Sequence, residues 1–255
     1  MTRLDAAFLR QPLAHRALHD IAAGRPENTR AAIRAAIARG YGIEIDVQMS
    51  SDGVAMVFHD NDLERLTNAS GPIRAQSAAG LAAIPLKGCD EGIPTLAEVL
   101  QLVACRVPLL VEVKDQHGQM GQTDGILEAS VARDLAGYAG PVAVMSFNPH
   151  SVIRLADLAT GVPRGIVTCA YAAHNWPELP EDVRNHLREI PDFDSAKASF
   201  VSHQWDDLDR PRVADLKEAG AAILCWTIRS PEAEARARRI AENITFEGYL
   251  PDMPA

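Results

Sequence analysis

Residues 42–48 read GIEIDVQ, a stretch with the alternation of a β-strand but an unusual choice of side chains. Successive side chains of a strand point to opposite faces, so the apolar residues share one face, while Glu44 and Asp46 share the other. A half-exposed strand with one polar face is the simplest explanation. Whether the two carboxylates are buried depends on the kind of sheet that the rest of the chain forms.

Short apolar runs rich in valine, isoleucine and leucine alternate along the chain with alanine-rich amphipathic segments. This alternation is typical of repeated βα units around a parallel sheet. Strands are expected at residues 12–15, 43–49, 109–114, 142–147, 165–169, 199–203, 222–228 and 244–250. Eight strands with intervening helices in 255 residues predict an α/β fold, a (β/α)8 TIM barrel that forms a single domain over residues 1–255.

Apolar residues recur at helical spacing between these strands. Helices are expected at residues 27–40, 95–104, 124–138, 149–158, 181–189, 211–219 and 231–241. Asn28 or Thr29 is expected to cap the first of these helices, and Gly40 is a typical helix stop. Thr95 and Glu98 have the spacing of a capping box, which predicts where the next helix begins.

The regular alternation breaks after the strand at 43–49. In SSDGVAMVFHD (50–60), the pair Asp52–Gly53 predicts a two-residue hairpin turn, and residues 54–59 form the returning strand. From about 61 to 94 the chain is polar and contains several prolines and glycines, so we expect an irregular insertion over the C-terminal mouth of the barrel. Loops at that end carry the chemistry of barrel enzymes.

Composition excludes several classes of function. The 25 basic and 34 acidic residues give a net charge of −9, which disfavours binding to nucleic acid. The four cysteines are widely spaced and contain no C-x-x-C pair, so neither a zinc ribbon nor a disulfide framework is expected. No segment is apolar enough for a signal peptide or a spanning helix, which predicts a cytoplasmic protein without stable membrane insertion. Any anionic substrate must then be held by local cations or a metal.

Both faces of a strand are covered in a parallel barrel, so an inward carboxylate is costly unless it is neutralised. The strand at 109–114 repeats the pattern, with Glu112 and Lys114 on the face away from its apolar residues. Three inward carboxylates, Glu44, Asp46 and Glu112, predict a site for one divalent cation. All-oxygen ligation favours Mg²⁺ or Ca²⁺ over zinc. The alternative is a buried ion-pair network with Lys114 and Arg16, but two cations do not balance three anions.

Two of the eight histidines have a position that indicates function. His15 ends the first strand, at the mouth of the barrel. Counting from a two-residue turn at Asp52–Gly53 places His59 directly opposite Asp46, with Cβ atoms about 5 Å apart. Two imidazoles beside a metal-bound phosphate would supply a general base and a general acid near neutral pH. For either histidine alone, a hydrogen-bonded structural role is an equally good explanation.

An ordered set of motifs supports this reading. They are AHRALHD (14–20), PENT (26–29), EIDVQMSSDG (44–53), FHDNDLERLTNASGPI (58–73), PTLAEVL (94–100), VEVK (111–114), SF (146–147), CWTIRSPE (225–232) and GYLPDMP (248–254). Each is weak singly, but together they resemble the glycerophosphodiester phosphodiesterase family over most of the chain. The resemblance implies a barrel that hydrolyses small-molecule glycerophosphodiesters to sn-glycerol 3-phosphate and an alcohol.

The resemblance also implies roles for individual residues. His15 and His59 match the family's acid/base pair, and Arg16 and Lys114 match its phosphate contacts. Trp226 matches an aromatic residue that packs near the glycerol. The metal ligands implied are Glu44, Asp46 and Glu112, with Mg²⁺ or Ca²⁺ as the expected ion and Mn²⁺ as a further candidate.

The chain departs from the family's motifs at three places. Ala17 stands where glycine is usual and is expected to have a negative φ. Arg229 stands where asparagine is usual, close enough to Trp226 to influence which head group fits. Pro251 and Asp252 replace the usual Thr-Asp pair near the end.

Two alternative functions remain at the level of sequence. One is a phospholipase D-like lyase acting on lysolipids, against which the absence of an apolar interfacial stretch counts. The other is a non-catalytic barrel that binds phosphorylated metabolites. A binding protein would have little reason to retain every acid/base and ligand position, which favours the enzyme.

Overall fold

The computed structural model describes residues 2–253, and its strands form a closed barrel. The sheet order is β1-β9-β8-β7-β6-β5-β4-β2-β3, and β1 also pairs with β2, which closes the ring. The strands are β1 (Leu13–Ala14), β2 (Gly42–Met49), β3 (Ala55–Val57), β4 (Leu109–Val113), β5 (Val142–Ser146), β6 (Arg164–Thr168), β7 (Phe200–Gln204), β8 (Ala222–Ile228) and β9 (Asn243–Phe246). All neighbours in the ring are parallel, and β3 alone of the described strands pairs antiparallel, with β2.

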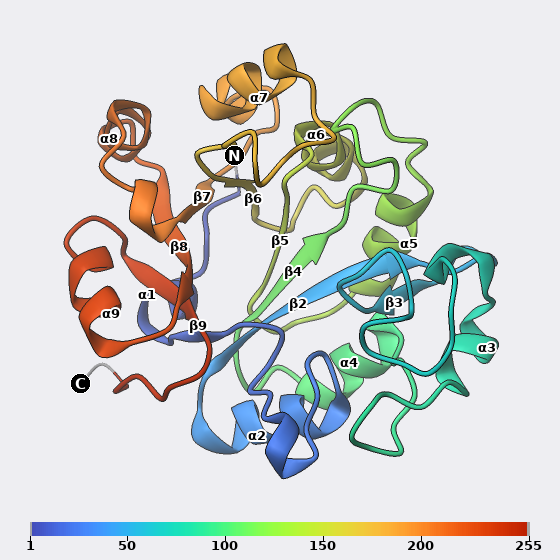
Figure 1. The fold of residues 1–255 in the computed structure, drawn as a ribbon. Helices are drawn as coiled ribbons and strands as arrows, with labels where there is room; N and C mark the ends of the chain where they lie inside the picture. Colours follow the sequence, from blue (N-terminus) through green and yellow to red (C-terminus); the bar gives the residue numbers. More distant parts are fainter. Residues whose placement is uncertain (1, 254–255) are drawn as a thin grey trace.

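The helices lie mostly around this ring, as Figure 1 shows. They are α1 (Ala7–Arg10), α2 (Arg30–Arg39), α3 (Ala78–Ala82), α4 (Leu96–Val103), α5 (Ile126–Leu135), α6 (Pro149–Leu158), α7 (Glu181–Arg188), α8 (Pro211–Glu218) and α9 (Pro231–Ala237), with 3-10 turns η1 (Ile21–Ala23), η2 (Ile73–Ala75), η3 (Pro191–Phe193) and η4 (Trp205–Asp207). The predicted TIM barrel is confirmed. None of the helices within residues 2–253 has the length and apolar character needed to cross a membrane.

Local signals placed the helix ends well. Thr29 caps α2 by accepting a hydrogen bond from the Ala32 N–H, and Gly40 ends it in the left-handed conformation. Thr95 and Glu98 form the predicted capping box at the start of α4. The last strand was expected to reach residue 250, but β9 ends at Phe246.

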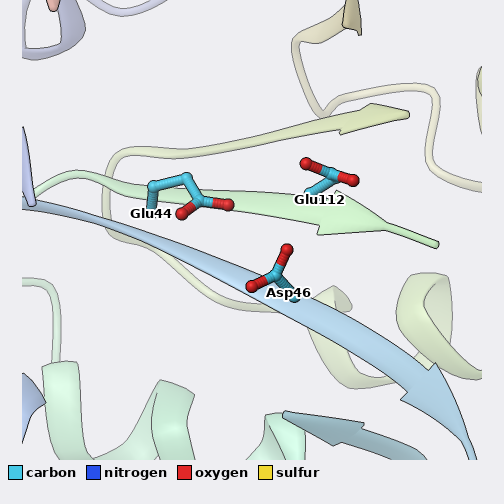
Figure 2. Close-up of side chains that lie close together, drawn as sticks. All are labelled: Glu44, Asp46 and Glu112. Atoms are coloured by element: carbon cyan, nitrogen blue, oxygen red, sulfur yellow. The ribbon is translucent and has the colours of Figure 1, made fainter. Parts of the chain in front are cut away.

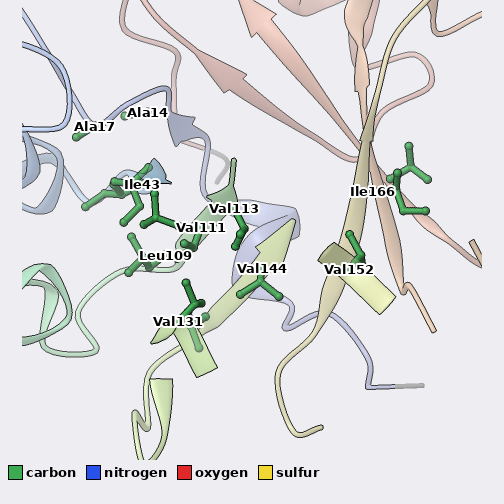
Figure 3. Close-up of a cluster of buried hydrophobic side chains, with 14 of the residues drawn as sticks. Ala14, Ala17, Ile43, Leu109, Val111, Val113, Val131, Val144, Val152 and Ile166 are labelled. Carbon is green, nitrogen blue, oxygen red and sulfur yellow. The ribbon is translucent and has the colours of Figure 1, made fainter. Parts of the chain in front are cut away.

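Two apolar layers enclose the sheet. The larger lies between the strands and the helices, and Figure 3 shows Val111 and Val144 of the sheet in this layer with Val131 of α5 and Val152 of α6. The smaller fills the barrel interior and includes Phe200 and other inward residues. Every residue of β2 is buried, so the half-exposed strand is excluded and its acids lie inside the protein.

The amino-terminal segment closes one end of the barrel. Phe8 of α1 is fully buried in the interior layer with Leu13 and Leu110. The Asn243 side chain, at the start of β9, donates hydrogen bonds to the carbonyl oxygens of Phe8 and Gln11. Since β9 begins there, α1 covers the end opposite the carboxyl ends of the strands, which leaves those ends open for a site.

The predicted register of the hairpin is wrong by one residue. Val47 pairs with Val57, and the Phe58 N–H donates to the carbonyl oxygen of Asp46 at 3.0 Å. The turn has three residues rather than two, because Ser50 and Val54 are joined by a hydrogen bond and the last turn residue has a φ of 76°. His59 is therefore not directly opposite Asp46.

The segment after β3 packs on its own small core. Residues from β3 to the start of α4 form a separate buried apolar cluster, made of Met56, Phe58, Leu63, Leu66, Ile73, Leu81, Leu86 and Ile93. In Figure 1 this segment, which includes α3, lies to one side of the ring. Its first residues, Asn61, Asp62, Glu64 and Arg65, line an open cleft of about 810 Å³ at the mouth of the barrel.

Replacing Gly165 by alanine should destabilise the barrel. A Cβ at Gly165 would lie 2.3 Å from the buried Phe200 ring, and overpacking of this kind costs about 1–3 kcal/mol. Denaturant unfolding of Gly165→Ala should report a loss of that size. Gly161→Ala is the matched control, because nothing lies within 4 Å of its added Cβ. Equal losses in the two variants would contradict the steric explanation.

Candidate active site

Three buried carboxylates meet on the inner face of β2 and β4. Asp46 and Glu112 are register partners across the two strands, and Glu44 is two residues before Asp46 on the same face. Oxygen atoms of the three groups lie within 4.8 Å of one another, and Figure 2 shows the carboxylates turned toward a common space. Their residues are 1%, 1% and 7% exposed for Glu44, Asp46 and Glu112. The structure thus brings the predicted ligands together.

The cations that could replace a metal neutralise part of this cluster. Lys114 Nζ lies 2.9 Å from Asp46 Oδ1 and 2.6 Å from Glu112 Oε1. Arg16 Nε lies 3.6 Å from Asp46 Oδ2. Glu44 has a hydrogen bond only from a backbone group among its described polar partners, the Arg16 N–H at 2.8 Å. An ion-pair network without metal would therefore neutralise Asp46 and Glu112 but would leave Glu44 without a cationic partner.

The pKa values follow this division. Burial, together with the charges of Asp46 and Glu112, raises the pKa of Glu44 well above its usual value. Burial would also raise the pKa of Asp46, but Lys114, His59 and Arg16 outweigh it and hold the pKa below the usual range. The cluster is thus short of positive charge at Glu44.

A divalent cation fits this donor set. Three carboxylate groups offer hard oxygen ligands, and the described part of the cluster includes no thiol or imidazole within the ligand group. The excess negative charge at Glu44 is what a doubly charged ion would offset. The residues that would hold it are Glu44, Asp46 and Glu112.

His15 follows β1 and lines the same cavity of about 170 Å³ as the three acids. Its Nδ1 lies 2.5 Å from Glu247 Oε2, so the carboxylate fixes which ring nitrogen carries hydrogen. Burial lowers the pKa of His15, although the hydrogen bond to Glu247 acts in the opposite direction. Burial would raise the pKa of Glu247, but the hydrogen bond from His15 and the nearby imidazole of His19, at 3.6 Å, hold it below its usual range.

His59 also lines this cavity, despite the error in the predicted register. Its Nδ1 lies 2.7 Å from Asp60 Oδ1, and Arg65 Nε donates to the second oxygen of Asp60 at 2.6 Å. Arg65 also binds Glu27, which in turn accepts from Arg16 at 2.9 Å. A chain of alternating charges therefore connects His59 with the residues around the acids.

Arg16, Lys114 and Trp226, the predicted substrate contacts, all line the same cavity. Trp226 packs edge-on against Phe147, with ring centroids 5.5 Å apart, and Trp176 lies 5.2 Å from Phe147. These three aromatic rings line the wider cleft outside. The site thus has a charged inner cavity and an outer cleft with an aromatic wall.

The expectation of a negative φ at Ala17 is wrong. Arg16 and Ala17 have φ values of 52° and 65°, both left-handed. This turn lets the Arg16 N–H reach the Glu44 carboxylate while the Ala17 N–H donates to the Glu44 carbonyl oxygen at 3.0 Å. Alanine pays about 1–2 kcal/mol for such a conformation, which explains why a glycine suits this position.

Sequence reasoning missed four polar residues of the site: Glu27, Asn28, Asp60 and Glu247. Asn28 was considered only as a helix cap. Its side chain instead donates a hydrogen bond to the Asp46 carboxylate at 3.0 Å, and its backbone is in the left-handed conformation with a φ of 60°. Glu27 lies in the same PENT motif. The signal for Glu247 was its place directly after a barrel strand, and for Asp60 its adjacency to His59.

Comparison with known proteins gives a consistent result. A model of the glycerophosphoryl diester phosphodiesterase family matches residues 15–244. YhdW of Bacillus subtilis (strain 168) is 27% identical over 251 residues, covering 95% of this chain and 94% of that protein. A glycerophosphodiester phosphodiesterase of Caldanaerobacter subterraneus subsp. tengcongensis is 31% identical over 159 residues, which span 59% of this chain and 65% of that protein.

Solved structures show the same fold. A phosphodiesterase of Oleispira antarctica, in complex with the product sn-glycerol-3-phosphate, matches with a TM-score of 0.76 and 24% identity over 94% of each chain. A structure from Silicibacter pomeroyi DSS-3 matches with a TM-score of 0.74 and 21% identity, covering 94% of this chain and 93% of that one.

Glu44→Gln should stabilise the metal-free protein at neutral pH. The pKa of Glu44 is higher in the folded protein than in the unfolded chain, where it is about 4.3. The folded protein therefore has its full stability below about pH 4.3, where Glu44 is protonated in both states, and loses stability as the pH rises through the folded pKa. In chelator at pH 8, the variant should exceed the natural protein by on the order of 1–3 kcal/mol, the cost of a poorly partnered buried group. The difference should vanish near pH 4.

Glu112→Gln provides the matched control for this measurement. It breaks the 2.6 Å ion pair with Lys114, so it should lower rather than raise the free energy of unfolding at pH 8. Stabilisation by both substitutions, or by neither, would show that Glu44 is not the uncompensated member of the cluster.

Proposed function

Because the chain belongs to the glycerophosphoryl diester phosphodiesterase family, we propose that it hydrolyses glycerophosphodiesters to sn-glycerol 3-phosphate and an alcohol, with a divalent cation and two histidines. The observation that supports this most strongly is the single cavity of about 170 Å³ lined by His15, His59 and all three buried acids. Each histidine has a carboxylate on Nδ1, at 2.5 Å for His15 and 2.7 Å for His59.

The histidines are arranged for proton transfer. With Nδ1 of each ring bound to a carboxylate, Nε2 is the nitrogen left for chemistry, and it makes no hydrogen bond to any residue within 2–253. One imidazole accepts the proton of the nucleophile, which is a water molecule or the glycerol 2-hydroxyl. Attack by the 2-hydroxyl gives a cyclic phosphate, which water then opens to sn-glycerol 3-phosphate. The other histidine, as the imidazolium, donates its Nε2 proton to the oxygen of the leaving alcohol. General acid–base catalysis of this kind contributes about 10²–10⁴-fold to a rate.

Charged side chains bind the phosphodiester. Arg16 and Lys114 line the cavity and donate to phosphate oxygens, with Arg16 held in place by Glu27. When bound at Glu44, Asp46 and Glu112, a divalent cation would supply further positive charge for the phosphate oxygens. Trp226 supports the glycerol, and the outer cleft has room for the alcohol.

His15→Ala and His59→Ala should each lower the turnover of glycerophosphocholine by at least about a hundredfold. Release of choline and of sn-glycerol 3-phosphate measures this directly. His174→Ala, on an exposed loop, is the matched control and should retain full activity. Undiminished turnover in either site variant would remove that histidine from the mechanism. Cleavage of micellar lysophosphatidylcholine in preference to glycerophosphocholine would instead favour the lyase.

Removal of divalent ions should abolish activity. Protein treated with excess chelator is expected to lose turnover and to regain it with Mg²⁺, Ca²⁺ or Mn²⁺, because all three accept carboxylate ligands. Comparing the three ions at equal concentration would identify the best cofactor. Full activity in excess chelator would reject the metal site. If chelator-treated Asp46→Asn regains as much activity on addition of metal as the natural protein does, Asp46 is not a ligand.

A further inference from the structure

Three neighbouring strands of the barrel end at the same level, and each continues into a charged or titratable residue. Phe246 of β9 pairs with Ile228 of β8 on one side and with Ala14 of β1 on the other. The next residues along these strands are Arg229, Glu247 and His15. Parallel strands present such residues side by side, so this row follows from the register of the sheet.

Hydrogen bonds connect the row from end to end. Arg229 donates to Glu247 Oε1 from Nε at 2.7 Å and lies 2.6 Å from the same oxygen through Nη2. The second oxygen of Glu247, Oε2, lies 2.5 Å from His15 Nδ1. The two oxygens of one carboxylate therefore have different partners, an arginine on one side and an imidazole on the other.

We propose that Arg229 and Glu247 are a positioning pair for His15: Arg229 fixes the Glu247 carboxylate, which in turn holds the Nδ1–H of His15 so that Nε2 faces the substrate. The proposal rests on the catalytic role proposed for His15. It differs from the expectation that Arg229 selects the head group of the substrate, because two of its nitrogens are directed at Glu247.

Stability does not explain the contact between Arg229 and Glu247. The Arg229 side chain is 64% exposed, and exposed ion pairs contribute little to folding. What the planar guanidinium does provide is a fixed orientation of the carboxylate. Orientation matters here because His19 Nε2 lies 3.6 Å from the same Glu247 oxygen that binds His15. Without Arg229, the carboxylate could turn toward His19 and release His15.

The second histidine supplies an internal comparison. His59 binds Asp60, and Asp60 binds Arg65, in the same order of imidazole, carboxylate and guanidinium. Arg65 also pairs with Glu27 and so belongs to the network around Arg16. Arg229, by contrast, has Glu247 as its ion-pair partner among the described residues, so its removal tests one histidine alone.

Kinetics of Arg229→Ala with saturating divalent ion and glycerophosphocholine test the proposal. Loss of an outer hydrogen-bonding partner typically costs about 10–100-fold, so kcat should fall by about tenfold or more while KM changes less than about twofold. Glu247→Ala should lower kcat at least as far, and adding Arg229→Ala to it should cause no further loss. Arg210→Ala is the control. It removes an arginine that lies just before α8 and pairs with Glu189, and it should leave activity unchanged.

A spectroscopic measurement separates positioning from a general structural effect. In ¹⁵N-histidine-labelled protein, His15 should be in the Nδ1–H tautomer, and Glu247→Ala should give a mixture of tautomers in protein that remains folded. An unaltered tautomer would overturn the proposal, as would a rise in KM at constant kcat in Arg229→Ala, which would make Arg229 a substrate contact. If the natural protein releases no choline from glycerophosphocholine, the proposed function fails. If it does and His15→Ala retains full activity, only the catalytic role of His15, on which this proposal rests, fails.

Discussion

The cost of burying three carboxylates inside a closed sheet is the constraint on which the rest of the site depends. Glu44, Asp46 and Glu112 are almost completely buried, and a buried charge must be compensated. Lys114 compensates two of them, and the left-handed turn at Arg16 offers a backbone N–H to the third. The polar surroundings of the barrel mouth, including Asn28 and Glu27, are organised around this cluster.

The barrel architecture explains how residues far apart in the sequence meet. Parallel strands carry their carboxyl ends to one side, and α1 closes the other. β2 and β4 contribute the acids, while β1, β8 and β9 contribute the row that contains His15. His59 comes from a different source, because it lies between β3 and the inserted segment with its own apolar core. One imidazole thus belongs to the ring and the other to its extension.

The sequence predicted the elements whose signals are local or periodic. The two-residue alternation in β2 and β4 placed the acids on the inner face, and capping residues such as Thr95 placed helix ends to within a residue or two. The predictions that were wrong concern three-dimensional geometry, which local sequence signals do not determine. The hairpin register changed because one more residue entered the turn before Val54, and the φ of Ala17 depends on hydrogen bonds to Glu44. The contact of Glu247 with His15 requires knowing that the first and last strands are neighbours.

That neighbourhood has a consequence for how the protein acquires its activity. β1 consists of two residues and pairs with both β2 and β9, so its place in the ring depends on a strand nearly the whole length of the chain away. While the chain leaves the ribosome, β1 and β2 emerge early and can pair with each other. β9 and Glu247 emerge last, after all of the strands from β1 to β8. Closure of the ring and support of His15 are then one late event. A nascent chain that stops short of this point would carry the three acids without the carboxylate that holds His15.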